Sequence, residues 1–204
     1  MKKTTFLLLL ILSFVSNSQT IENVILESRT KLFNENKVKA DSGDAKAQYD
    51  LGQMYHYGVG TKIDKIKAFD YYEKSSNQGN LEGKYALATS YYSGDGVKKD
   101  KKKAIELFTE CSEKGDYNSK FNLANMYFYG ESTEVNQEKA FELYLECAKN
   151  GDTNSQIIVG MIYYNGFGIE KNKEKAKVWL NKAKDEGNKM ATQLIKEIDE
   201  KEVK

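Results

Sequence analysis

Residues 54–60, MYHYGVG, decide the fold because similar strings return three more times along the chain. The later copies are SYYSGDG at 90–96, MYFYGES at 126–132 and IYYNGFG at 162–168. The first glycines of the four strings follow one another at steps of 36 residues (94 minus 58, for example): Gly58, Gly94, Gly130 and Gly166. A fixed period of about 20–50 residues is typical of a solenoid, in which each repeat is one supersecondary unit.

Each repeat predicts a pair of helices. In the first repeat, Asp44 is a good N-cap residue, and Gly58 tolerates the left-handed conformation that often ends a helix. Asp64 then caps a second helix that ends near Gly79. The complete absence of proline fits a chain that is almost all helix. We therefore predict an all-α fold, an α/α superhelix (solenoid) of about four 36-residue helix-turn-helix repeats with terminal capping helices.

The same frame gives the domain organisation. Residues 1–18 are typical of a secretory signal peptide, since Lys2 and Lys3 precede an apolar run and small residues follow it. The run is too short to span a membrane. The remaining segments are an N-terminal linker with a capping helix, four repeats and a C-terminal capping helix: 19–43, 44–79, 80–115, 116–151, 152–187 and 188–204. We expect an exported chain, located in the bacterial periplasm or outside the cell.

His56 is the single histidine, and its position in the repeat argues against catalysis. The later repeats place Tyr92, Phe128 and Tyr164 there, so the position requires a flat ring for packing rather than a general base or a metal ligand. The chain has no zinc-ligand spacing, no glycine-rich phosphate loop after a strand and no Ser–His–Asp set. We therefore expect no catalytic, metal or cofactor-binding residues and no cofactor.

Two cysteines, Cys111 and Cys147, are one period apart and occupy the same position in neighbouring repeats. Packed helices lie roughly 8–10 Å apart, whereas a disulfide needs Cα atoms within about 7 Å. We predict two separate buried thiols, with a disulfide as the alternative if curvature brings the two helices together.

The charge is nearly balanced, with 31 basic and 30 acidic residues. This balance gives no electrostatic reason to expect nucleic acid or an anionic membrane as a partner. We expect a monomer that binds a protein or a peptide.

The first helix of each repeat has two packing sides and a third stripe at which the repeats stop agreeing. This stripe suits an extended segment of a partner, and the alternative is that it is merely solvated. The candidate partner-binding residues are Lys46, Asp50, Gln53, Tyr57, Thr89, Ser93, Asn122, Asn125, Tyr129, Met161 and Asn165. If the stripe binds a partner, replacing Asn122, Asn125 and Tyr129 together should weaken partner capture and leave the melting temperature nearly unchanged.

With these residues in place, the chain resembles a Sel-one-like repeat (SLR) protein, a tetratricopeptide-like α-solenoid. Residues 45–79 nearly spell out the family pattern, and KDKKKAIELFTECSEKGD and KNKEKAKVWLNKAKDEGN carry its second half. The third repeat departs from the pattern, because Ser132 stands where the turn glycine belongs. The resemblance implies an interaction scaffold. The cysteine pairs that staple each hairpin in some relatives are absent.

Two functions follow from these observations. The first is an exported, non-enzymatic scaffold or adaptor that binds a partner protein or peptide through the concave face of the solenoid. The alternative is an envelope protein with penicillin- or peptidoglycan-binding or weak β-lactamase-like activity, to which the family has been linked. Such serine enzymes need S-x-x-K together with S-D-N and K-T-G. The segment SRTK at 28–31 matches the first element, but the chain has neither companion.

Overall fold

The computed structural model describes the backbone of residues 2–200 and the side chains from residue 20 to residue 200. Within this range the chain forms ten helices and no strand, which confirms the predicted all-α fold. The helices are α1 (Lys2–Asp41), α2 (Ala45–Tyr57), α3 (Lys65–Asn77), α4 (Leu81–Ser93), α5 (Lys101–Glu113), α6 (Tyr117–Tyr129), α7 (Gln137–Lys149), α8 (Thr153–Asn165), α9 (Lys173–Asp185) and α10 (Lys189–Glu200). The side chains of the predicted signal peptide lie outside the described residues.

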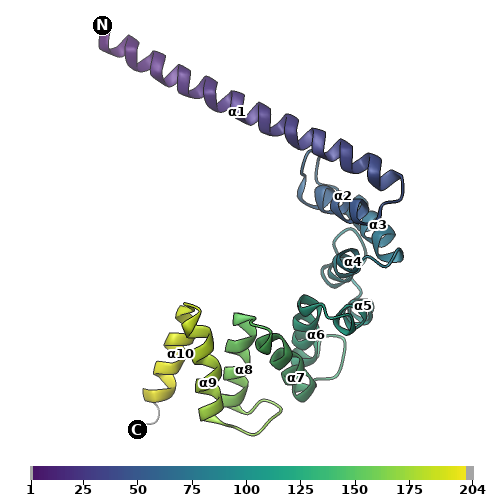
Figure 1. Cartoon of the computed structure of the whole chain (residues 1–204), viewed down its shortest axis with the longest axis vertical. Coiled ribbons are helices and arrows are strands. Elements are labelled where there is room, and N and C mark those ends of the chain that lie inside the picture. The colour runs from purple at the N-terminus through teal and green to yellow at the C-terminus, as the bar shows by residue number, and fades with distance from the viewer. Residues whose placement is uncertain (1, 201–204) are drawn as a thin grey trace. The chain divides into compact units, whose positions relative to one another are not determined.

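The helices form two compact units, Met1–Lys99 and Asp100–Lys204. The N-terminal unit contains α1 to α4, and the C-terminal unit contains α5 to α10. Within the C-terminal unit, α8, α9 and α10 lie side by side (Figure 1). Each repeat supplies a first and a second helix, so α2, α4, α6 and α8 are first helices and α3, α5, α7 and α9 are second helices.

The predicted helix caps are confirmed at both kinds of helix. The Asp44 side chain accepts a hydrogen bond from the backbone N–H of Ala47, and Asp64 does the same for Lys67. Gly58 ends α2 with a φ of 72°, in the left-handed region that glycine adopts without a steric penalty. These local signals fix where each helix begins and ends, and therefore which side chains face the neighbouring helices.

Small residues let the two helices of a repeat approach closely, as the sequence predicts. A Cβ atom added to Gly52 would lie 2.6 Å from a carbon of the Tyr72 ring, so the ring fills the space that a larger residue would need. In the third repeat Ala124, Ala140 and Tyr144 belong to one buried cluster. Burial of such side chains across successive helices supplies the continuous core of a solenoid.

The third repeat keeps the usual turn although it lacks the usual glycine. Ser132 adopts a φ of 59°, close to the 69°, 75° and 70° of its equivalents Gly60, Gly96 and Gly168. A residue with a Cβ atom is strained in this left-handed region, by about 1–2 kcal/mol. The substitution therefore changes the energy of the turn and not its conformation.

Neither cysteine forms a disulfide and both are buried, which confirms the prediction of two separate thiols. The Cys147 sulfur lies 3.5 Å from the carbonyl oxygen of Tyr117, its hydrogen-bond acceptor. Burial raises the pKa of the Cys147 thiol to about 11. These cysteines fill a small position in the core that Ser75 and Ala183 fill in other repeats.

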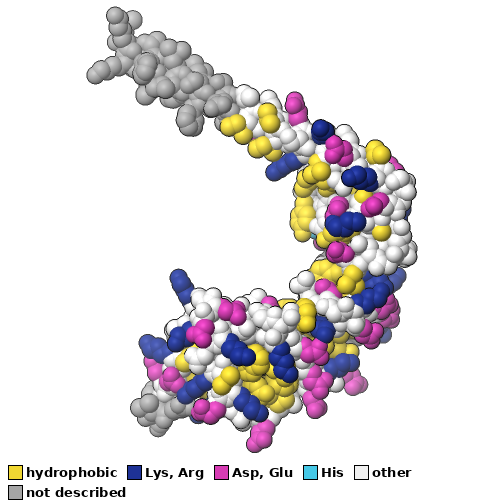
Figure 2. Space-filling model, in the orientation of Figure 1, with side chains coloured by type: hydrophobic (Ala, Val, Ile, Leu, Met, Phe, Trp, Pro, Cys, Tyr) yellow, Lys and Arg dark blue, Asp and Glu magenta, His cyan; other side chains and the backbone are white. Residues whose placement is uncertain are grey.

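Charged side chains of both signs are interspersed on the visible face of each unit (Figure 2). Charged side chains also form ion pairs with a neighbouring repeat. The Lys65 amine lies 2.6 Å from the Asp95 carboxylate, and the Lys101 amine lies 2.8 Å from the Glu131 carboxylate. A surface of this kind has no broad single-sign field on the face in view, in keeping with the near-neutral composition.

Candidate functional site

The side chains selected from the sequence for partner binding all lie on first helices, and none of them is buried. The exposed members are Lys46, Tyr57, Thr89, Ser93, Tyr129 and Met161. The half-buried members are Asp50, Gln53, Asn122, Asn125 and Asn165. Those from Lys46 to Ser93 belong to the N-terminal unit and the others to the C-terminal unit, so each unit carries its own part of the stripe.

Several of these polar side chains already bond to the backbone of their own helix. The Thr89 hydroxyl donates to the carbonyl of Tyr85 at 3.0 Å, and the Ser93 hydroxyl donates to the carbonyl of Thr89 at 2.9 Å. The side-chain amide of Asn165 donates to the carbonyl of Met161 at 2.9 Å. A hydroxyl oxygen and a side-chain carbonyl engaged in this way still have lone pairs that can accept a hydrogen bond from a partner.

A cavity recurs at the same place in the repeat, between a first helix and the helix at the equivalent position of the next repeat, which after α8 is the capping helix α10. It lies between α2 and α4 in the N-terminal unit, and between α6 and α8 and again between α8 and α10 in the C-terminal unit. The residues that line the three cavities occupy equivalent positions, two repeats apart between the first and second cavities and one repeat apart between the second and third. Equivalent lining residues on the helices are Gln53, Asn125 and Met161 on the first helix and Tyr72, Tyr144 and Leu180 on the second.

The cavity of the N-terminal unit has a volume of about 220 Å³ and a lining rich in polar groups. Thr89, Ser90 and Ser93 contribute hydroxyls from α4. The carboxylate of Asp95 also borders the cavity, and its hydrogen bond from Lys65 lowers the pKa of Asp95. Because Lys65 already balances this carboxylate, the cavity offers mainly uncharged hydrogen-bonding groups.

The cavity between α6 and α8 has nearly the same volume, about 230 Å³, but an apolar lining. Phe167 borders it at the position where Asp95 stands in the N-terminal unit. The rings of Phe167 and Phe128 meet edge to face with centroids 5.6 Å apart. Ile158 and Met161 line the facing helix, α8. The same place in the repeat is thus more apolar in the C-terminal unit, where Asn125, Tyr129 and Tyr144 supply the remaining polar groups.

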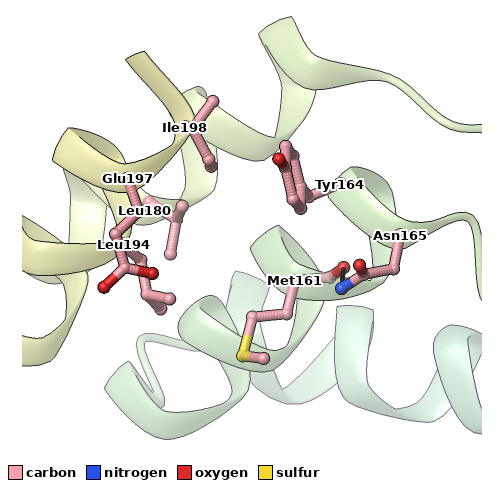
Figure 3. A pocket seen from close by; sticks show the side chains of 7 residues that line it. All are labelled: Met161, Tyr164, Asn165, Leu180, Leu194, Glu197 and Ile198. Atoms are coloured by element: carbon pink, nitrogen blue, oxygen red, sulfur yellow. Dashed lines mark hydrogen bonds between the residues drawn. The ribbon is translucent and has the colours of Figure 1, made fainter. Parts of the chain in front are cut away.

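The cavity between α8 and α10 is smaller, about 110 Å³, and is drawn in Figure 3. Leu180, Leu194 and Ile198 supply apolar surface, and Met161 borders this cavity as well as the preceding one. Glu197 is the one charged side chain among the described residues that line this cavity and the cavity between α6 and α8.

Asn125 has a structural task that the sequence did not reveal. Its side-chain oxygen accepts a 2.6 Å hydrogen bond from the hydroxyl of Tyr144, a residue that is only 2% exposed. Removing Asn125 would leave a buried hydroxyl without this partner, at a cost of about 1–3 kcal/mol. This hydrogen bond changes the expectation for the joint replacement of Asn122, Asn125 and Tyr129, which should lower the melting temperature because of Asn125.

Sequence reasoning also missed lining residues outside the third stripe. The structure adds the ring position of the first helix, the aromatic residue of the second helix and one residue of the connecting turn. These residues are His56 and Phe128, Tyr72 and Tyr144, and Asp95 and Phe167. The turn between the two helices of a repeat keeps its length, but its residue changes from the acidic Asp95 to the aromatic Phe167. This change is the sequence signal that could have indicated the turn residue.

His56 has the packing role that the sequence predicts, at the edge of the cavity. Its ring is half-buried and meets the Tyr57 ring edge to face, with centroids 4.6 Å apart. Its equivalent Phe128 borders the matching cavity of the C-terminal unit. Among the described residues there is no group of three histidine, cysteine or acidic side chains arranged to hold a metal ion.

The segment SRTK, on which the serine-enzyme alternative rests, lies on α1. Ser28 is exposed, and the Lys31 amine lies 4.0 Å from Glu35, with 80% of the Lys31 side chain exposed. A serine nucleophile needs a base within hydrogen-bond reach and a site that excludes water. The exposed surface of α1 offers no such enclosure at Ser28, and nothing supports the β-lactamase alternative.

Comparison with known proteins identifies the repeat. A profile of the Sel1 repeat matches residues 45–80, 81–116, 118–152 and 153–188. The chain belongs to the Sel1 repeat family. A search of curated proteins gives no match.

Solved structures share the Sel1 repeat fold with this chain. A protective antigen of uropathogenic Escherichia coli that displays an SLR fold is 30% identical with a TM-score of 0.75, over 78% of this chain and 34% of that one. A Sel1 repeat protein from Oxalobacter formigenes is 29% identical with a TM-score of 0.73, over 80% and 66% of the two chains. This chain therefore spans about a third of the first protein and just under two thirds of the second. The cysteine-rich protein B of Helicobacter pylori, 24% identical with a TM-score of 0.51 over 65% and 95% of the two chains, shares the fold.

Sel1 repeats generally act in protein–protein interactions. Within the described residues, no helix of this Sel1 repeat chain is both long enough and apolar enough to cross a membrane.

Proposed function

We propose that this Sel1 repeat chain is an exported, non-enzymatic adaptor that binds a segment of a partner protein along its first helices. The observation that carries the proposal is the recurrent cavity between first helices, whose place is constant while its lining changes from repeat to repeat. By contrast, the buried position of Leu51 stays apolar in every repeat, with Leu87, Leu123 and Val159 as its equivalents. A concave place that recurs at the same position while its chemistry varies suits a recognition surface.

The chemistry of the linings suits a polypeptide ligand. A peptide segment presents backbone N–H and C=O groups together with side chains of mixed polarity. The N-terminal unit offers hydroxyls and amides, whereas the C-terminal unit offers aromatic and aliphatic side chains. Export is supported by the leader-like residues 1–18 alone. Export by a signal peptide predicts cleavage after Ser18. Mass spectrometry of the protein purified from its native source would then detect a chain that begins at Gln19.

Photo-cross-linking in the native cells would test the binding surface. A benzophenone amino acid would replace Thr89 on α4 or Met161 on α8, each of which borders a cavity. The matched controls are Ile66 on α3 and Val178 on α9, which are 66% and 56% exposed and belong to second helices. We expect one discrete cross-linked partner band from the cavity positions and none of that size from the controls.

Three results would contradict the proposal. A partner that cross-links only from Ile66 or Val178 would move the binding surface to the second helices. A partner that cross-links from every exposed position would show non-specific association. Turnover of a β-lactam substrate by the purified protein, abolished by Ser28→Ala, would restore the enzyme alternative.

A further inference from the structure

The cavity between α6 and α8 and the cavity between α8 and α10 form one composite surface, because Met161 borders both of them. Met161 lies on α8 between the neighbouring first helices and is 40% exposed. A ligand that covers Met161 therefore contacts both cavities. The thioether side chain is flexible and polarisable, so it adapts to different apolar partners.

The first of these cavities fits a large apolar side chain. Its lining includes Phe128, Ile158, Ile162 and Phe167, and it carries no charged group. Phe167 remains 39% exposed, although a ring of this kind is usually better covered. Aromatic side chains pack well edge to face against such rings, with a gain of about 0.5–1.5 kcal/mol beyond the area buried.

The second cavity adds a negative charge at an apolar site. Figure 3 shows the carboxylate of Glu197 near Leu194, with Leu180 and Met161 also in the lining. Glu197 accepts a 3.0 Å hydrogen bond from the side-chain amide of Gln193. Among the described side chains no lysine or arginine forms an ion pair with Glu197, so its charge is available to a ligand.

The negative charge is specific to this cavity and is not a feature of the repeat. Glu197 occupies the position that Met161, Asn125 and Thr89 occupy in the preceding repeats, none of which is charged. A lysine or arginine suits the combination, because its aliphatic stem packs on apolar surface while its cationic end reaches a carboxylate.

We infer that the C-terminal unit selects a partner segment that presents a large apolar or aromatic side chain together with a lysine or arginine. The apolar residue enters the cavity between α6 and α8, and the basic residue lies across Met161 with its charge at Glu197. This inference rests on the proposed function, since it names the chemistry of the segment that the adaptor binds.

Selection from a library of random 12-residue peptides displayed on phage, with the purified full chain as bait, would test the inference. We expect enrichment of peptides that contain both Phe, Trp, Leu or Met and at least one Lys or Arg. The decisive variant is Glu197→Lys, which should exchange this preference for peptides with Asp or Glu. It should also weaken a selected basic peptide by about fivefold to tenfold. Glu197→Gln should weaken the same peptide by about twofold to fivefold.

The apolar anchor has its own variant and control. Met161→Ser should weaken binding of the selected peptide by about tenfold, since buried apolar anchors dominate such interfaces. Val178→Ser is the matched control, because Val178 is also exposed and lies on α9 outside the two cavities, and it should leave the affinity unchanged. Helical circular dichroism of all variants should match that of the parent.

The outcomes distinguish failure of the inferred peptide selectivity from failure of the proposed adaptor function. Peptides without basic residues, or an unchanged preference in Glu197→Lys, would overturn the inference and leave the adaptor function standing. Failure of the library to yield any binder that Met161→Ser weakens would also overturn the inference. The adaptor function itself is tested separately, and it fails if the cavity positions give no specific cross-link in cells.

Discussion

The hydroxyl of Tyr144 donates a 2.6 Å hydrogen bond to the side-chain oxygen of Asn125. Tyr144 is buried on a second helix, whereas Asn125 is half-buried on a first helix and borders a cavity. Burial raises the pKa of Tyr144, so the hydroxyl stays protonated and remains a donor over the whole physiological range. The bond joins α7 to α6 at the cavity that both residues line. Asn125 therefore stabilises the fold and also borders the candidate binding surface.

Asn125→Ala should destabilise the protein by about 1–3 kcal/mol because it leaves the Tyr144 hydroxyl without its partner. Tyr144→Phe alone should cost about 0.5–1.5 kcal/mol, and the double variant should cost less than the sum of the two. Urea unfolding monitored by circular dichroism measures all three. Strict additivity would show that the hydrogen bond contributes nothing.

Ser132→Gly should stabilise the protein by about 0.5–1 kcal/mol. Glycine removes the strain of the left-handed conformation, and the greater conformational entropy of glycine in the unfolded chain offsets part of this stabilisation. The converse change, Gly168→Ala, should destabilise it by more than about 1 kcal/mol. At Gly168 φ is 70°, and an added Cβ atom would lie 2.6 Å from the carbonyl carbon of Gln137. Thermal melting of the two variants should shift in opposite directions, and a shift in the same direction would refute this account of the turn.

Ala140→Leu should overpack the core of the third repeat and cost about 1–3 kcal/mol. Ala140 is fully buried in the cluster that contains Ala124, Tyr144 and Val159. The expected result is a lower midpoint in urea with helical content retained. A variant as stable as the parent would mean that the contact between the two helices has room that the structure does not show.

The Cys147 thiol predicts a dependence of stability on alkaline pH. Its pKa is about 11 in the folded chain, against an ordinary value of 9.0. As the pH rises above 9, the unfolded thiol ionises first, so the unfolded state binds fewer protons and the free energy of unfolding falls until about pH 11, by at most about 1.4 kcal/mol per pH unit. Urea unfolding between pH 8 and pH 10.5 should show this slope, and Cys147→Ser should lose it. A slope that survives the serine substitution would assign the effect to other groups.

Reactivity of the thiols offers a simpler check on the same core. Both cysteines are buried thiols outside any disulfide, so Ellman's reagent at pH 8 should titrate almost no thiol in the native protein and two thiols in guanidinium. Absence of free thiol even after unfolding would indicate the disulfide that the sequence left open.

The helix pairs could be predicted from the sequence because their signals are local and repeated. Asp44 and Gly58 mark the ends of α2 by their own side chain and backbone, without help from distant residues. The small position at Gly52 likewise indicates close packing, although its partner Tyr72 is known only from the structure.

The cavities could not be predicted because they depend on contacts between repeats. Nothing in the sequence indicates that Tyr144 bonds to Asn125, 19 residues away, or that Phe167 turns its ring toward Phe128. The role of Glu197 could not be predicted either, because the sequence indicates a capping helix at 188–204 and does not show that this helix lines a cavity. Alignment of the repeats gives the candidate positions, and side-chain packing decides which of them line a cavity.

The most direct test of partner binding through the first-helix cavities is methyl NMR of the protein labelled at methionine, titrated with the cross-linked partner or the selected peptide. Met161 borders two cavities, whereas Met190 is 63% exposed and borders neither of them. We predict that the Met161 methyl resonance shifts and saturates with the partner while that of Met190 stays in place. A saturating shift at Met190 with Met161 unmoved would contradict the account.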